Sequence, residues 1–193
     1  MLSQLKHATT TMDIIDTAIP DVKIIKPRVW NDERGFFLES FNARRFQELT
    51  GIEVSFVQDN HSKSMRGVIR GLHYQIERTQ GKLVRVISGR VFDVAVDLRK
   101  SSPSFGQWVG EVLTADNFYQ MWVPPGFAHG FLVLEDNTEF LYKTSDFHAP
   151  EYERTIQWDD PDLGIDWPMA DLDVRLSDKD KSGNSFANAE VFN

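Results

Sequence analysis

The sequence contains no cysteine among its 193 residues. That absence excludes a disulfide framework, a thiolate nucleophile and any metal site built on cysteine. No apolar run is long enough to cross a bilayer, and the first residues, MLSQLKHATTT, are too polar for a secretory signal. We therefore expect a soluble cytoplasmic protein with no membrane partner.

Basic residues are also in short supply, and the formal net charge is −8. Because proteins that bind nucleic acids in general carry a basic surface, this balance argues against such a partner. The cations are unevenly placed. Residues 61–100 carry nine Lys and Arg against three Asp and Glu, whereas residues 151–193 carry four against eleven. A positive segment in an acidic chain favours a pocket for a small anion.

Helical periodicity is nearly absent, and the only clear helix signal begins at Asn42, a good N-cap, and ends before Gly51. Short runs of β-type residues separated by turns fill most of the chain. The expected strands are residues 13–17, 22–30, 36–41, 54–60, 67–75, 83–88, 91–98, 107–113, 119–123, 129–134 and 138–145.

Many short strands without βαβ alternation predict an all-β fold, an antiparallel jelly-roll barrel of cupin type with one or a few short helices. We expect residues 1–11 to be a flexible extension. Residues 12–193 are expected to form a single domain whose tail, after Pro150, wraps the barrel. In the strand over residues 91–98 the even positions are apolar and the odd face carries Asp93 and Asp97, which predicts one dry face and one face with acids to satisfy.

The most informative stretch is GVIRGLHYQIERTQGK, residues 67–82. His73 and Gln75 share one face of a strand, on which Ile69 is also expected, while Arg70 needs a bulge at Gly71 to join them. A histidine flanked by Arg70 and Lys82 suits the removal of a proton from an anionic substrate. A core histidine that only satisfies its own hydrogen bonds is the alternative.

A second stretch, Trp122 to Gly130, holds the pattern Pro-x-Gly-x-x-His and resembles the second motif of the cupin superfamily, in which that histidine often binds metal. The first cupin motif normally supplies a His-x-His pair, but here the residues are His73, Tyr74 and Gln75. Because an amide is a poor ligand for a transition metal and no third strong ligand follows, we predict no metal site.

Taken together, these stretches resemble the dTDP-4-dehydrorhamnose 3,5-epimerase family, the metal-free cupins of deoxysugar biosynthesis. The resemblance runs from about Met12 to about Asp180. It rests on AIPDV (18–22), DERGFF (32–37), FVQDNHSKS (56–64), RGLHYQ (70–75), QGKLVR (80–85), FDVAVDLRK (92–100), FGQWVG (105–110), PPGFAHGF (124–131), FLYK (140–143) and WDDPDLGIDWP (158–168).

The resemblance implies an isomerase that inverts C3 and C5 of a dTDP-linked 4-keto-6-deoxyhexose without a cofactor. Both carbons flank the C4 ketone, so a base can remove their protons to give an enolate. The resemblance assigns the base to His73 and the proton donor to Tyr142, and it places Lys82 near the enolate oxygen. Asp180 is the expected acidic partner of His73, and the sequence leaves Asp178 open as an alternative.

The resemblance also implies a homodimer and a set of substrate-binding residues: Arg34, Glu39, Gln58, Asn60, Arg70, His129, His148, Glu153 and Lys179. One departure concerns the base of the nucleotide. Where the family commonly has paired tyrosines after the FLYK strand, this chain has Phe147 and His148, so His148 would have to replace the tyrosine that stacks on thymine.

Three other functions remain open from the sequence. A close relative could invert only one carbon, or isomerise the ketone, on a similar nucleotide sugar. A metal-dependent cupin oxygenase would need bound iron or a similar metal. A non-catalytic sugar-binding cupin would not need His73 and Tyr142 on one cavity wall.

Overall fold

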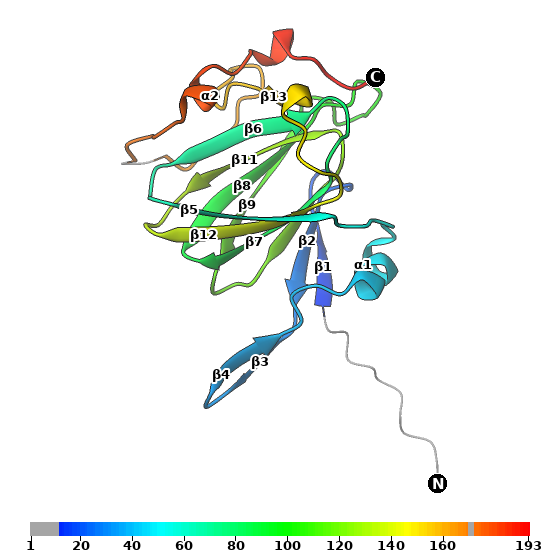
Figure 1. Ribbon diagram of the computed structural model, residues 1–193, viewed down its shortest axis with the longest axis vertical. Coiled ribbons are helices and arrows are strands. Elements are labelled where there is room, and N and C mark those ends of the chain that lie inside the picture. The colour runs from blue at the N-terminus through cyan, green and yellow to red at the C-terminus, as the bar shows by residue number, and fades with distance from the viewer. Residues whose placement is uncertain (1–11, 170–171) are drawn as a thin grey trace.

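The computed structural model describes residues 12–169 and 172–193, and the extension expected over residues 1–11 lies outside them. Two antiparallel sheets face each other and form a barrel, with the helices outside it (Figure 1). One sheet has the order β1 (Met12–Asp16), β2 (Lys23–Pro27), β10 (Gln120–Val123), β7 (Lys82–Ser88), β12 (Thr138–Thr144), β5 (Gln58–Ser64). The other has the order β13 (Glu153–Thr155), β6 (Ile69–Gln75), β11 (Phe127–Val133), β8 (Arg90–Asp97), β9 (Trp108–Thr114).

The remaining elements lie outside these two sheets. They are the hairpin of β3 (Val29–Asp32) and β4 (Gly35–Leu38), helices α1 (Ala43–Thr50) and α2 (Asp178–Lys181), and two 3-10 helices, Pro150–Tyr152 and Phe186–Asn188. The predicted all-β jelly roll is therefore confirmed. In the described part of the chain, no helix has both the length and the apolar character needed to cross a membrane.

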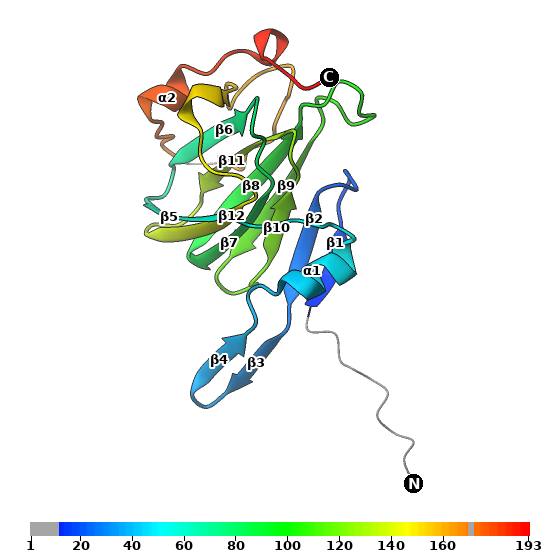
Figure 2. The same ribbon diagram turned by 45° about the vertical axis from the view of Figure 1, so that its right-hand side comes forward.

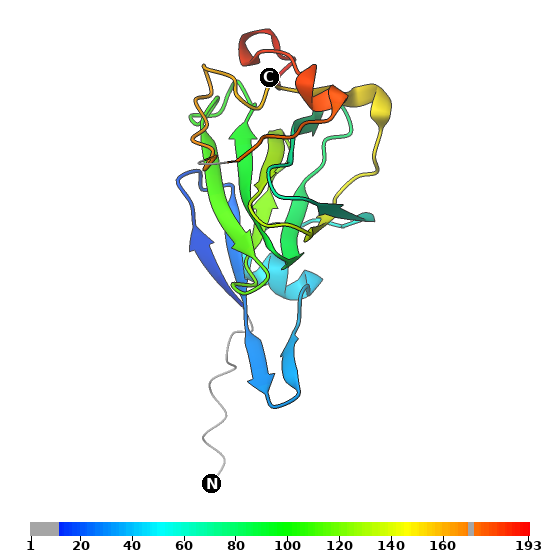
Figure 3. The same cartoon turned by 90° about the vertical axis from the view of Figure 1, so that its left-hand side faces the viewer.

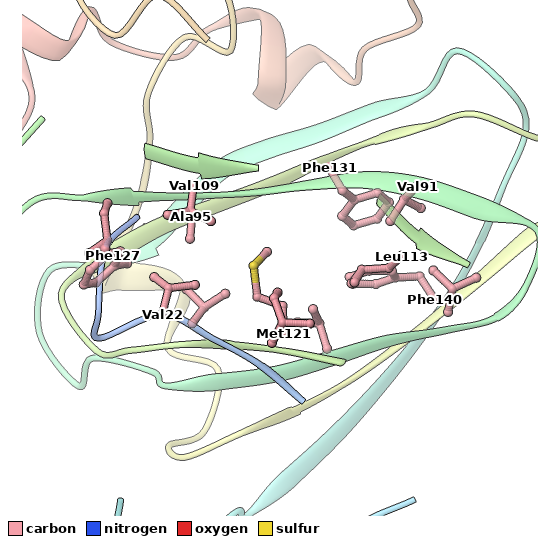
Figure 4. Packing of buried hydrophobic residues seen from close by; sticks show 14 of the residues in the cluster. Val22, Val91, Ala95, Val109, Leu113, Met121, Phe127, Phe131 and Phe140 are labelled. Atoms are coloured by element: carbon pink, nitrogen blue, oxygen red, sulfur yellow. The ribbon is translucent and has the colours of Figure 1, made fainter. Parts of the chain in front are cut away.

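The main core lies between the two sheets (Figure 4). Val84 and Met121 from one sheet meet Ala95 and Leu113 from the other, and all four are fully or almost fully buried. Phe140 completes this core by stacking on Phe131 with ring centroids 4.2 Å apart. Burial of such side chains supplies most of the free energy that holds the sheets together.

Two further apolar clusters cover the outer faces of the barrel. The C-terminal segment packs Leu163 and Trp167 on the outer face of the five-stranded sheet (Figure 3). Helix α1 packs Phe46 against Trp122 on the outer face of the six-stranded sheet (Figure 2). As predicted, Asn42 caps this helix by accepting a hydrogen bond from the Arg45 N–H.

Strand β8 has the two faces that its sequence predicted. Asp93 and Asp97 on its odd face are both fully buried, and both acids have hydrogen-bond partners. The strand lies between β11 and β9; its inner face points into the barrel and its outer face lies under the C-terminal segment. Asp97 is satisfied by Arg99, Ser102 and Ser104 at 2.6–2.9 Å, and Asp93 by a histidine described below.

Two strand boundaries also differ from the prediction. The run over residues 22–30 is split, because β2 ends at Pro27 and the hairpin strand β3 begins at Val29. The strand expected over residues 54–60 begins only at Gln58, since Val54 and Phe56 pack beside α1 instead.

Strand β6 contains the predicted irregularity at Gly71. His73 pairs with His129 of β11, but Arg70 pairs with Phe131, so two residues of β6 face only Gly130. This extra residue changes the alternation and brings Arg70 to the same face as His73. The placement of Ile69 on that face was wrong, because Ile69 packs in the outer cluster with the C-terminal segment.

The close approach of β6 and β11 at this bulge generates a stability prediction. Gly71 has φ of 122° and a Cβ there would lie 2.5 Å from the Gly130 Cα. Gly35 has φ of 123° with nothing within 4 Å of its Cβ position. We expect Gly71→Ala to lower the free energy of unfolding by about 3 kcal/mol or more, and Gly35→Ala by about 1 kcal/mol, in urea titrations. Equal losses would show that backbone strain alone, without the close approach, sets the cost.

Candidate active site

A cavity of about 350 Å³ opens between the two sheets, beyond the Phe131–Phe140 pair that ends the apolar core. Most of its lining comes from inward-facing residues of five strands, β5, β6, β7, β11 and β12. It is lined by Gln58, Asn60, Ser62, Arg70, His73, Tyr74, Gln75, Gln80, Lys82, His129, Phe131, Tyr142, His148, Glu153 and Lys179. The structure thus brings together ten of the thirteen predicted site residues as lining.

An eleventh predicted residue, Asp180, lies directly behind His73. The His73 Nε2 is 2.6 Å from the Asp180 Oδ1, and that oxygen also accepts the Gly71 N–H at 3.2 Å. Ser177 caps the short helix α2 and donates its hydroxyl to the Asp180 Oδ2 at 2.6 Å. The Asp178 side chain is fully exposed, so the choice between the two acids is settled geometrically in favour of Asp180.

The hydrogen bonds of Asp180 fix its charge. Burial would raise the pKa of this carboxyl, but the bonds from His73, Ser177 and Gly71 outweigh burial and lower the pKa to about 2. Because an ionised carboxylate can only accept, His73 donates its Nε2–H to it. The proton-free nitrogen of the neutral His73 ring is therefore Nδ1.

The environment of His73 keeps the ring neutral. Burial lowers the pKa of His73 below its ordinary value of 6.5, and the cations Lys179 and Lys82 lower it further, against the raising effect of Asp180. A neutral imidazole with a fixed tautomer is the form that a general base requires.

Lys82 brings a buried cation next to this base. Its Nζ donates to the His73 carbonyl at 3.3 Å, and its side chain is almost fully buried. Burial lowers the pKa of Lys82 to about 8, while Asp93 and Glu153 raise it. At neutral pH most molecules still carry the charge, which can stabilise a developing oxyanion.

Tyr142 faces the same cavity from the other sheet, on strand β12. Burial raises the pKa of its hydroxyl above the ordinary value of 10, so the group keeps its proton at neutral pH. Arg70 lies close enough to lower that pKa, and it donates to the Ser64 hydroxyl at 3.1 and 3.2 Å. A neutral imidazole and a protonated phenol thus lie on opposite sheets around one cavity.

Charged residues also surround the cavity near α2. Lys179, the neighbour of Asp180 in α2, forms an ion pair with Glu153 of β13. The His148 Nε2 is 3.6 Å from the other Glu153 oxygen, and about half of the His148 side chain is exposed. Burial raises the pKa of Glu153, but Lys179 lowers it more, so this carboxylate is ionised.

His129 forms a buried pair that the sequence did not assign. Its Nε2 lies 2.9 and 3.1 Å from the two oxygens of Asp93 on the neighbouring strand β8. Burial raises the pKa of Asp93, and His129 and Lys82 oppose that rise. The sequence did show that Asp93 lies on the face of its strand whose acids need partners. It did not show that the partner is His129, because that residue lies on another strand.

Two predicted residues do not reach this cavity within one chain. Arg34 lies at the tip of the β3–β4 hairpin, forms an ion pair with Asp32 and is largely exposed. Glu39 accepts from the Asn42 side chain at 3.2 Å and lies 3.7 Å from Arg45. Both therefore belong to the region around the hairpin and the start of α1, away from His73.

The residues offer no arrangement of strong metal ligands. Across residues 12–169 and 172–193, no group of three or more His, Cys, Asp or Glu side chains could hold an ion. Gln75, at the position where many cupins have a ligand, uses both ends of its amide in hydrogen bonds to neighbouring backbone.

Comparison with known proteins gives this geometry its context. The family model described as dTDP-4-dehydrorhamnose 3,5-epimerase matches residues 16–188. The chain belongs to the dTDP-4-dehydrorhamnose 3,5-epimerase family. A Pseudomonas aeruginosa protein of that name is 64% identical over 175 residues, which cover 91% of this chain and 96% of that protein.

Solved structures of this epimerase family agree with the fold. A Legionella pneumophila dTDP-6-deoxy-D-glucose-3,5-epimerase, in complex with dTDP-4-keto-L-rhamnose, superposes with a TM-score of 0.90 at 54% identity, covering 93% of this chain and 95% of that one. A 3'-monoepimerase from Streptomyces bikiniensis, in complex with dTDP-quinovose, gives a TM-score of 0.84 at 33% identity over 89% and 87% of the two chains. The chain is thus an isomerase of cupin-like fold.

The charges of this epimerase-family site can be tested without substrate. We expect NMR titration of the His73 ring to give a pKa below 6.5, because burial and two cations disfavour its charged form. Lys179→Met removes one cation and should raise that pKa. Asp180→Asn removes the anion and should lower it.

Lys181→Met is the matched control, since Lys181 lies on the same helix but is exposed and paired with Asp178. It should leave the His73 pKa within about 0.2 of the wild-type value. A wild-type pKa above 6.5, or equal shifts from the two lysine variants, would contradict the described electrostatics.

Proposed function

We propose that the chain inverts both C3 and C5 of dTDP-4-dehydro-6-deoxyglucose to give dTDP-4-dehydrorhamnose. The observation that carries the proposal is the pairing of a neutral, carboxylate-oriented His73 with a protonated Tyr142 on opposite sheets of one cavity. A base on one side of the sugar and an acid on the other would exchange a C–H proton with inversion.

The proposed steps use only side chains that line the cavity or lie directly behind it. His73 takes the proton from C3 or C5, and the electron pair moves into the C4 carbonyl to form an enolate. Lys82 stabilises the oxyanion, and Asp180 stabilises the imidazolium that forms. Tyr142 then gives its proton to the opposite face of the same carbon, and exchange with solvent restores both groups. No redox change occurs, so the steps require no cofactor.

The nucleotide part of the substrate would use the remaining cations and polar groups. Arg70 and Lys179 are suited to the diphosphate, because guanidinium and ammonium groups donate several hydrogen bonds to phosphate oxygens. Gln58 and Asn60 of β5 line the same cavity. His148 lies at the position where we expect the thymine ring to stack. A cytoplasmic location and a single domain over residues 12–193 remain part of this proposal.

Solvent deuterium exchange distinguishes the roles proposed for His73 and Tyr142. In heavy water, His73→Asn should abolish both epimerisation and solvent exchange, a loss on the order of 100-fold or more. Tyr142→Phe should lose net inversion but retain deuterium exchange at the original face, because His73 can still form the enolate. NMR and mass spectrometry of the recovered sugar measure both quantities.

The same experiment distinguishes the neighbouring functions. Wild-type protein should introduce deuterium at C3 and at C5 with inversion of both centres. Exchange at C3 alone would favour single epimerisation, a possibility raised by the structural likeness to a 3'-monoepimerase. Exchange that persists in His73→Asn but stops in Tyr142→Phe would reverse the two assignments.

The proposal includes a homodimer in which each hairpin serves the other subunit. Arg34 matches a substrate-binding position of the family, yet its own hairpin extends away from the barrel (Figure 1). Trp30, Phe36 and Phe37 on this hairpin are all exposed, and such an aromatic surface favours a protein contact. A partner subunit in which the hairpin lies near the cavity would bring Arg34 to the substrate.

Subunit complementation tests this arrangement. Arg34→Ala and His73→Asn should each have low activity as homodimers. A mixed dimer of the two variants holds one site with both wild-type residues, so equal mixing after unfolding and refolding should restore about a quarter of wild-type activity. Native mass spectrometry of the mixed sample would give the exchange efficiency, because the two variants differ in mass. No recovery in a sample with proven exchange would place Arg34 and His73 in the same chain's site, or Arg34 outside it.

A further inference from the structure

The segment over residues 146–149 carries the side chains that depart from the family pattern. Phe147 and His148 are both exposed, whereas Ala149 is buried. A segment with exposed side chains has no packing of its own to fix its position. Its backbone must therefore be held by hydrogen bonds from its surroundings.

Three glutamine side chains supply four of those hydrogen bonds, and we call Gln58, Gln75 and Gln80 the glutamine set. Thr144 adds a bond from its hydroxyl to the Asp146 carbonyl at 2.8 Å. Gln80 donates its Nε2–H to the Asp146 carbonyl at 2.9 Å. Gln58 accepts the His148 N–H at 3.1 Å. Gln75 donates to the Phe147 carbonyl at 3.3 Å and accepts the Ala149 N–H at 2.9 Å. Each of the four residues in the segment is thus bonded through its backbone.

Gln75 is the central member of this set. It is almost completely buried, and its second Nε2–H donates to the Arg78 carbonyl at 2.8 Å. Both amide hydrogens are therefore used within the protein, so Gln75 has no donor left for a substrate. Although Gln75 lines the cavity, the hydrogen bonds of its amide run to backbone atoms of Arg78, Phe147 and Ala149.

We propose that Gln75 and Gln80 are positioning residues that set nucleotide affinity by holding His148 in place. This inference rests on the proposed function, in which His148 stacks on the base. Within the segment, the glutamine set bonds only to backbone atoms. The position of that backbone therefore does not depend on which side chains occupy positions 147 and 148. The segment can therefore present different side chains at a fixed position and so determine which base is accepted.

The test is a double-mutant cycle between Gln75 and His148. Gln75→Met keeps the side-chain volume and removes every amide hydrogen bond. We expect it to raise KM for the dTDP-linked sugar about tenfold while kcat falls less than about threefold. His148→Ala alone should already raise KM. Adding Gln75→Met to that variant should raise KM by less than about twofold more, because the side chain that Gln75 positions is gone.

Two further variants keep the test independent of folding. Asn117 is a matched control, since its amide makes three hydrogen bonds to the backbone of β9 and of the turn before β10, outside the cavity. Asn117→Leu should leave KM within about twofold of wild type even if it lowers the melting temperature. If Gln75→Met does not fold, Gln80→Met replaces it in the cycle as a milder change, because Gln80 is only partly buried and the Asp146 carbonyl keeps its bond from the Thr144 hydroxyl.

The outcomes distinguish failure of the positioning role from failure of the proposed epimerase activity. Equal rises in KM in both backgrounds would show that Gln75 acts without His148, and would overturn the positioning role while the epimerase stands. An unchanged KM in Gln75→Met would overturn it too. Wild-type protein that neither binds dTDP in calorimetry nor exchanges deuterium into the sugar would overturn the proposed function and the inference together.

Discussion

The contact between His73 and Asp180 joins two parts of the chain that are 107 positions apart. One belongs to the five-stranded sheet and the other to a short helix near the C-terminus. A buried carboxylate is costly unless it is fully hydrogen-bonded, and Asp180 meets that condition with a ring N–H, a backbone N–H and a hydroxyl. The orientation of the base therefore depends on correct packing of the C-terminal segment on the barrel.

That packing is anchored at several points. The segment is bridged to the residue before β6 through Arg175 and Val68, and a second bridge joins Ile156 to Asn184. Its apolar side chains, including Trp167, cover the outer face of the same sheet whose inner face carries His73. One sheet thus separates a dry outer layer from a charged cavity, and the bulge at Gly71 decides which residues face each side.

The cavity carries more cations than anions, which suits the proposed anionic substrate. Lys82, Lys179 and Arg70 all line this cavity. Lys82 is almost fully buried, and only Lys179 has a carboxylate ion-pair partner among the described residues. Like charges in a poorly solvated site disfavour protonation of His73 and favour binding of an anion. The same arrangement therefore supports both substrate recognition and the neutral state of the base.

The sequence predicted most of the fold because alternation and turn residues are local signals. Asn42 and Gly51 marked α1 correctly, and the His73 strand was found with its bulge. Contacts between distant segments could not be read in this way. Nothing local distinguishes a buried Asp93 from a solvated one.

The residues that complete the site were missed for the same reason. The role of Gln75 became visible only when residues 146–149 were placed beside it. Arg34 was predicted, but its approach to the cavity rests on the proposed dimer, which a single sequence does not reveal. The fold and the proposed base, acid and Asp180 partner were thus accessible from the sequence, whereas the contacts of Asp93 and Gln75 required the structure.

The central claim is that the sugar lies between a base on one sheet and an acid on the other. A crystal structure of the inactive His73→Asn variant with dTDP-4-dehydro-6-deoxyglucose tests it most directly. We predict that residue 73 and the Tyr142 hydroxyl lie on opposite faces of the hexose, each within about 3.5 Å of C3 or C5 or of its hydrogen. A sugar bound with both residues on one face, or with C3 and C5 outside the cavity, would contradict the account.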